Sequence, residues 1–75
     1  MKRYEVIREI FISCSNKWQI DSSFTDEVHT DDTYAQMLLW FRGSLPGHTA
    51  QTADDGCIVY TITGDVPERY TFAEF

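Results

Sequence analysis

A chain of 75 residues with 43% hydrophobic and 15% aromatic residues can build one small domain, and it has the apolar area that disordered segments lack. The net charge at pH 7 is −6, and residues 21–75 hold ten of the twelve acidic residues but only two of the six basic ones. So few Lys and Arg side chains argue against direct contact with nucleic acid or with an anionic membrane surface. A basic protein partner is compatible with this charge.

The two cysteines, Cys14 and Cys57, are too few for a disulfide framework. The first residues run into an alternating segment instead of the apolar core of a signal peptide. No apolar run approaches the ~20 residues that a membrane-spanning helix needs. We therefore expect a complete, cytoplasmic chain with both thiols reduced.

Residues 3–13 predict a β-strand with apolar side chains on both faces. The even positions are apolar apart from Arg8: Tyr4, Val6, Ile10, Ile12 and Cys14. Ile7 and Phe11 add apolar side chains to the odd positions, which is typical of a central strand.

After a turn at residues 15–16, the next segment alternates more regularly. The apolar side chains lie on even positions: Trp18, Ile20, Phe24 and Val28. This pattern predicts a half-buried strand, bent or bulged at residues 22–23.

The period then changes to that of a helix. Residues 30–33 form a cluster of capping side chains, and the apolar residues that follow are spaced i, i+3, i+4, i+7: Tyr34, Met37, Leu38 and Phe41. Gly43 is placed to take the left-handed conformation at C′. We predict a helix from about Asp31 to Arg42.

The last third of the chain predicts antiparallel hairpins. Asp55-Gly56 precedes the β-rich run 57–63, which is a strong hairpin signal, so the polar segment 48–53 is interpreted as a short edge strand, with a loop as the alternative. A turn at residues 64–67 leads to a final alternating strand at residues 68–74. The predicted fold is a single α+β domain over residues 1–75, with an antiparallel sheet of four or five strands packed on one α-helix in the order β-β-α-β-β-β.

This fold predicts a core drawn from the inward rows of the strands and the helix stripe. Its members are Val6, Ile10, Ile12, Trp18, Ile20, Phe24, Tyr34, Met37, Leu38, Phe41, Ile58, Tyr60, Ile62, Tyr70 and Phe72.

No constellation in the sequence predicts catalysis, a cofactor or a metal site. The cysteines and the histidines, His29 and His48, lack the close paired spacing of zinc ligands, and neither cysteine precedes a helix that would activate its thiol. The four glycines form no phosphate-binding loop. We expect a protein that is not an enzyme and that needs no cofactor.

Two features suggest protein binding. The first is an acidic cluster at the second strand and the helix start, made of Asp21, Asp26, Glu27, Asp31 and Asp32. Carboxylates in a row can imitate phosphates toward a basic nucleic-acid-handling protein, and the alternative is a solvated acidic face that keeps the chain soluble.

The second feature is the end of the helix. On a helical wheel Trp40 lies about 100° from the centre of the apolar stripe and Leu39 lies nearly opposite it. Together with the elbow at residues 45–46 they predict an exposed apolar patch, and the alternative is that the loop 44–47 folds over Trp40.

Three segments, which together extend over most of the chain, carry a resemblance to other proteins. They are YEVxREIF from Tyr4 to Phe11, DGxIVY from Asp55 to Tyr60 and RYTFxE from Arg69 to Glu74. In these segments the chain resembles a group of short, acidic, uncharacterised bacterial proteins met in gut Firmicutes and their mobile elements. The shared motifs are strand and turn patterns, so the resemblance implies no functional residue. In size and acidity the chain is also similar to anti-CRISPR and other phage-encoded inhibitors, a likeness of composition.

The leading hypothesis is therefore a non-enzymatic protein-binding module, an inhibitor of the mobile-element or phage type, with Leu39, Trp40 and the acidic cluster as candidate contacts. The alternative is a homo-oligomeric structural protein, in which a homodimer buries the sheet edges and the apolar patch.

Overall fold

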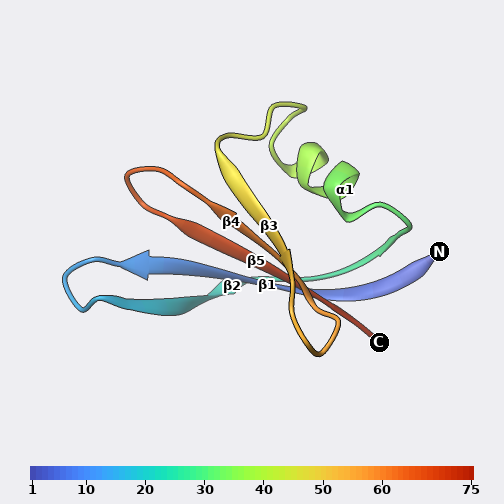
Figure 1. Ribbon diagram of the computed structural model, residues 1–75, viewed down its shortest axis with the longest axis horizontal. Coiled ribbons are helices and arrows are strands. Elements are labelled where there is room, and N and C mark those ends of the chain that lie inside the picture. The colour runs from blue at the N-terminus through green and yellow to red at the C-terminus, as the bar shows by residue number, and fades with distance from the viewer.

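The computed structural model describes the backbone of residues 1–75 and every side chain except that of Thr25. It contains one antiparallel sheet and a single short helix, which confirms the α+β class (Figure 1). The elements are β1 (Lys2–Ile12), β2 (Lys17–Thr30), α1 (Thr33–Trp40), β3 (His48–Thr52), β4 (Ile58–Ile62) and β5 (Glu68–Glu74). The segment 48–53, predicted as a strand with a loop as the alternative, thus contains strand β3.

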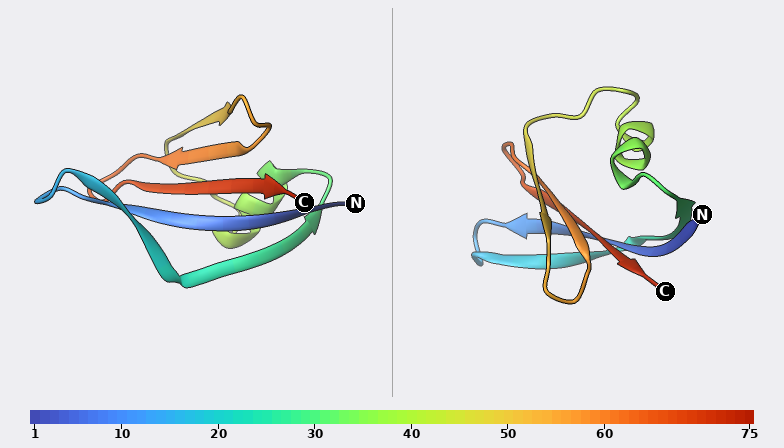
Figure 2. Two further views of the ribbon diagram at one scale, coloured as in Figure 1. Left: turned by 90° about the horizontal axis from the view of Figure 1, so that it is seen from below. Right: turned by 45° about the vertical axis from the view of Figure 1, so that its right-hand side comes forward.

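The sheet has the strand order β2-β1-β5-β4-β3, and all its pairs are antiparallel. The C-terminal strand β5 therefore lies in the middle of the sheet, between β1 and β4, whereas β2 and β3 form the two edges. The helix stands on one side of this twisted sheet (Figure 2). We call the opposite side the open face. No helix among the described residues has the length and apolar character needed to cross a membrane.

The pairing of β1 with β2 is interrupted at the predicted bend. The register shifts between Ile7 and Glu9, so that residues 21–24 of β2 lie opposite Arg8 alone. Directly opposed residues of an antiparallel pair share a face. The extra residues reverse the alternation of side chains along β2. Even-numbered side chains therefore face the helix after the bend and face the opposite side of the sheet before it.

This reversal corrects the predicted inward row of β2. Val28 pairs with Tyr4 and is buried under the helix, whereas Trp18 pairs with Phe11 on the open face. Ile20, which was expected in the core, pairs with Glu9 on the open face and is 59% exposed.

The core is smaller than predicted and is displaced toward the N-terminal end of β1. Its buried side chains are Tyr4, Val6, Val28, Met37, Tyr60, Ile62, Tyr70 and Phe72. The other predicted members are half-buried, apart from the exposed Ile20 and Tyr34: Ile10, Ile12, Trp18, Phe24, Leu38, Phe41 and Ile58. An eight-residue helix is about 12 Å long and β1 about 36 Å, so the helix covers only part of the sheet.

The helix is shorter than the predicted range from about Asp31 to Arg42, by two residues at each end. Asp32 caps it by accepting the backbone N–H groups of Tyr34 (3.1 Å) and Ala35 (3.2 Å). At the other end the N–H of Gly43 donates to the carbonyl of Leu38 at 2.7 Å, as in a Schellman motif. Arg42, with a φ of 56°, occupies the C′ position that was predicted for Gly43, and Gly43 follows it with a φ of 84°.

Candidate binding surfaces

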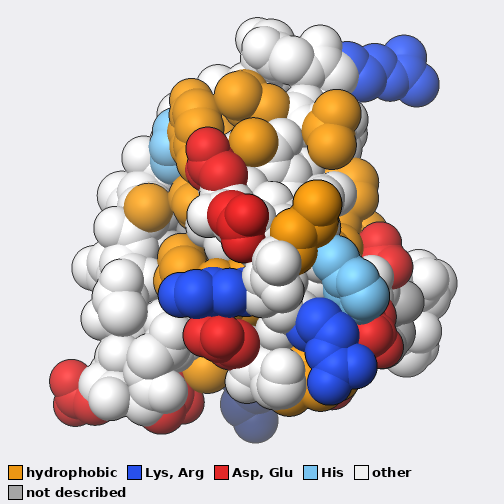
Figure 3. Space-filling model, turned by 90° about the vertical axis from the view of Figure 1, so that its right-hand side faces the viewer, with side chains coloured by type: hydrophobic (Ala, Val, Ile, Leu, Met, Phe, Trp, Pro, Cys, Tyr) orange, Lys and Arg blue, Asp and Glu red, His pale blue; other side chains and the backbone are white. Residues whose placement is uncertain are grey.

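The five residues of the predicted acidic cluster do not form one surface. Asp26 and Glu27 are neighbours on a strand and so point to opposite faces of the sheet. Asp32 is engaged in the helix cap, and Asp31 lies 3.8 Å from the N-terminal amino group. On the side of the molecule shown in Figure 3, red carboxylates stand in separate groups among blue, orange and white side chains.

Asp21 lies in a polar network on the helix side of the sheet. Its carboxylate forms an ion pair with Arg8 and accepts the backbone N–H of Ser23 at 3.1 Å. Hydrogen bonds from the Ser23 hydroxyl and backbone N–H, together with Arg8, lower the pKa of Asp21 below its usual value. This acidic residue thus closes the bend in β2 and contributes no free charge to a docking face.

Arg8 joins the same network to β5. Its Nε donates to Glu68 at 2.8 Å and to the Tyr70 hydroxyl at 3.1 Å, and its Nη2 pairs with Glu68. Burial alone would lower the pKa of Arg8, but the bonds to Glu68 and Tyr70 outweigh burial and raise it. Burial and the Glu68 charge also raise the pKa of Tyr70, which keeps its hydroxyl protonated as a donor. The charges of Arg8, Asp21 and Glu68 are thus paired with one another.

The predicted patch at the end of the helix is also divided. Trp40 packs against the core, stacked on Tyr70 and Phe72 with ring centroids 5.9 Å apart and edge-on to Phe24 at 5.3 Å. Leu39 is 74% exposed. Of the two alternatives that the sequence left open, the exposed patch of Leu39 and Trp40 is contradicted, because Trp40 is half-buried against the rings of β5.

A different group of side chains stands out on the open face, close to the β1–β2 turn. The Arg69 guanidinium donates two hydrogen bonds to Glu9, at 2.9 and 3.0 Å, and lies 4.3 Å from the centre of the Trp18 ring. Phe11 meets the Trp18 ring edge-on at 5.3 Å. We call Glu9, Phe11, Trp18 and Arg69 the open-face cluster.

All members of the open-face cluster are half-buried, although no second layer of the protein covers them. The register explains their meeting: Glu9 pairs with Arg69 across β1 and β5, and Phe11 pairs with Trp18 across β1 and β2. The sequence offered one signal, the apolar Phe11 on the second parity of β1. The sequence pattern did not reveal this cluster because its alternation places Trp18 in the core.

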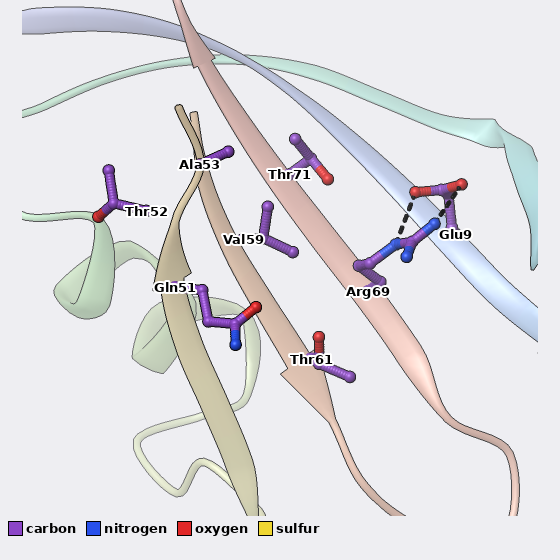
Figure 4. Close-up of a pocket in the computed structure, with 8 residues that line it drawn as sticks. All are labelled: Glu9, Gln51, Thr52, Ala53, Val59, Thr61, Arg69 and Thr71. Carbon is purple, nitrogen blue, oxygen red and sulfur yellow. Dashed lines mark hydrogen bonds and ion pairs between the residues drawn. The ribbon is translucent and has the colours of Figure 1, made fainter. Parts of the chain in front are cut away.

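A shallow hollow of about 650 Å³ adjoins this cluster (Figure 4). It extends across the open face from β1 to β3 and is lined mainly by polar side chains: Glu9, Gln51, Thr52, Ala53, Val59, Thr61, Arg69 and Thr71. The hydroxyl and amide groups offer hydrogen bonds to a polar ligand segment. The paired Glu9 and Arg69 leave the hollow without a strong net charge.

Among the described side chains, no three His, Cys, Asp or Glu groups lie together as metal ligands would. Cys14 and Cys57 are both free thiols. A hydrogen bond with Asp55 raises the pKa of the Cys57 thiol, as do burial and the Asp55 charge. Since the thiolate is the reactive form, this environment suppresses the nucleophilicity of Cys57.

No protein-family model, no curated protein and no solved structure matches the chain.

Proposed function

We propose that the chain is a non-enzymatic protein-binding module whose partner docks on the open face. The observation that carries this proposal is the open-face cluster, an aromatic pair and an ordered guanidinium on a sheet face that no other layer covers. Trp and Arg are the side chains most enriched among residues that dominate protein interfaces.

The open-face cluster is also held in place before any partner arrives. Arg69 is fixed between the Glu9 carboxylate and the Trp18 ring, so it loses less side-chain entropy on binding than a free arginine. The half-exposed rings still offer apolar area for burial. Preorganised contacts of this kind favour a stable complex.

The charge of the chain favours a basic partner, and we propose an inhibitor of the mobile-element or phage type that occupies a nucleic-acid-handling protein. A net charge of −6 on a small domain speeds association with a positive surface and disfavours contact with nucleic acid itself. Because the carboxylates are dispersed over the surface, this attraction comes from the electrostatic field of the whole molecule and not from one acidic cluster.

A pull-down from a bacterial lysate with two matched variants tests the proposal. Trp18→Ala removes the centre of the open-face cluster, and Leu39→Ser removes an exposed apolar side chain from the helix. We expect a specific protein retained by the wild type and by Leu39→Ser, and at least tenfold less of it retained by Trp18→Ala. Equal retention by all three proteins would contradict docking on the open face.

The second candidate function is a homo-oligomer, which is supported by the two sheet edges. β2 and β3 each have a neighbour on one side only, so either can pair with another copy. Sedimentation over a concentration series separates the two functions. A rise in mass with concentration supports self-association, whereas a constant monomer mass supports the binding module.

A further inference from the structure

Strand β3 presents unpaired backbone groups at the edge of the sheet. In the hairpin with β4, the N–H of Thr63 donates to Gly47 at 2.9 Å and that of Ala53 donates to Cys57 at 2.8 Å. Hydrogen-bonded positions alternate along an antiparallel ladder, so the odd residues of β3 bond to β4. The N–H and C=O groups of His48, Ala50 and Thr52 therefore point outward, away from the sheet.

The two edges of the sheet differ in how well they are protected. β2 is interrupted by its bend at residues 21–24 and carries charged side chains along its length, and both features discourage pairing with another strand. β3 has the sequence HTAQT, without proline, lysine or a carboxylate, and it pairs with β4 in an unbroken register. Four of its five residues are exposed. β3 is thus the edge that accepts an added strand.

The charges around β3 indicate what kind of strand it accepts. Asp54 and Asp55 follow one end of β3. At the other end Thr63 bonds to Gly47, and Asp65 comes two residues after Thr63. No Lys or Arg occurs between Arg42 and Arg69. An added segment with basic side chains at its ends gains attraction to these carboxylates, whereas a second copy of this chain brings its own charge of −6.

We infer that the partner adds an extended, basic segment to the free edge of β3, with its backbone bonded to His48, Ala50 and Thr52. This inference rests on the proposed protein-binding function and specifies the docking mode. Main-chain hydrogen bonds provide the affinity in such strand addition, and alternate side chains provide the specificity.

The hollow supplies the specificity. Gln51 and Thr52 of β3 stand at its rim, and Thr61, Thr71 and Arg69 line it toward the open-face cluster (Figure 4). Every second side chain of an added strand points to the open face, where a long polar side chain reaches this hollow. The bound segment and the open-face cluster thus form one continuous docking surface.

The test uses peptides selected from a random 12-residue phage library against the immobilised wild-type protein. Three variants report on the mode of binding. Ala50→Pro removes an outward N–H without removing a bond to β4, and Ala50→Thr is its control because it keeps the N–H. Asp54→Asn with Asp65→Asn removes two charges from carboxylates that form no hydrogen bond or ion pair with the described side chains.

We expect the selected peptides to be basic and rich in β-branched residues, and to bind Ala50→Thr as tightly as the wild type. Ala50→Pro, which should unfold at nearly the same temperature as the control, should lose at least tenfold in affinity. The double aspartate variant should lose about threefold to tenfold at low salt, and less at high salt because exposed charges are screened. This variant keeps the test decisive if Ala50→Pro fails to fold.

Three outcomes would overturn the inference. Acidic or neutral peptides contradict the basic partner, and equal affinity for Ala50→Pro and Ala50→Thr contradicts strand addition. If that affinity is lost instead in Trp18→Ala, the proposed function stands and only the β3 mode fails. If sedimentation shows a dimer of the wild type that Ala50→Pro abolishes, the occupant of β3 is a second copy.

Discussion

Arg8 is a charged residue on the side of the sheet that holds the core, and its partners explain why the fold tolerates it. Glu68, Tyr70 and Asp21 surround the guanidinium, so its burial is compensated by charge-assisted hydrogen bonds. In the sequence Arg8 appears only as the one interruption of an apolar row. The alternation of β1 therefore indicated that Arg8 lies on the core side, but it could not predict the partners of Arg8, because these come from β5 and from the bend in β2.

The lowered pKa of Asp21 predicts how the stability of the fold depends on pH. A carboxyl whose pKa is lowered on folding stabilises the native state above its unfolded pKa, and this contribution is lost as the pH falls through the folded pKa. Asp21→Asn should therefore reduce the free energy of unfolding at pH 7, and this difference between the two proteins should be smaller at about pH 3, below the unfolded pKa of the carboxyl. Urea unfolding at both pH values measures this, and a difference that persists unchanged at the lower pH would contradict it.

The reactivity of the Cys57 thiol tests the effect of its neighbour Asp55. The Asp55 carboxylate raises the pKa of the thiol, so at pH 8 the thiolate is a smaller fraction than in a free cysteine. Asp55→Asn removes the charge while its amide oxygen can still accept the Cys57 N–H, which Asp55 accepts at 3.0 Å. Alkylation of Cys57 by iodoacetamide, followed by mass spectrometry, should become faster in this variant. An unchanged or slower rate would show that Asp55 does not control the thiol.

At the scale of the elements, local sequence patterns were sufficient to predict a helix or strand wherever the side chains of that segment alone determine its structure. Alternation predicted the strands, and the capping cluster at residues 30–33 predicted the helix start to within two residues. The faces of β2 were predicted wrongly beyond its bend, because the number of residues in a bulge depends on the pairing with β1. The helix end was misplaced because Arg42 adopts a left-handed conformation that the pattern reserves for glycine.

The last turn of the helix makes a prediction about packing. Trp40 stacks on Tyr70 and Phe72, so Trp40→Ala should lower the free energy of unfolding by about 2–3 kcal/mol, less than a fully buried aromatic because Trp40 is half-buried. Leu39→Ser, one residue earlier and exposed, should change it by less than about 0.5 kcal/mol. Chemical denaturation of both variants measures this. Similar losses in both would mean that Trp40 is not packed against the sheet.

At the scale of the whole molecule, the fold leaves half of its sheet surface without a second layer. The order β2-β1-β5-β4-β3 places the C-terminal strand in the centre, which no local pattern predicts because it depends on pairing between distant segments. The open-face cluster has the same origin, since Arg69 reaches Glu9 and Trp18 only through this order. For this reason the sequence could not predict the open-face cluster on which the proposed binding surface rests.

Amide hydrogen exchange in β3 tests most directly the central claim, that the chain binds a partner at a surface that its own fold leaves open. In the free monomer we predict slow exchange at Thr49 and Gln51, which bond to β4, and fast exchange at His48, Ala50 and Thr52. A bound basic peptide should slow exchange at these three residues and leave the other two unchanged. Slow exchange at all five residues in the free monomer, or fast exchange at the three outward residues while the peptide is bound, would contradict the claim.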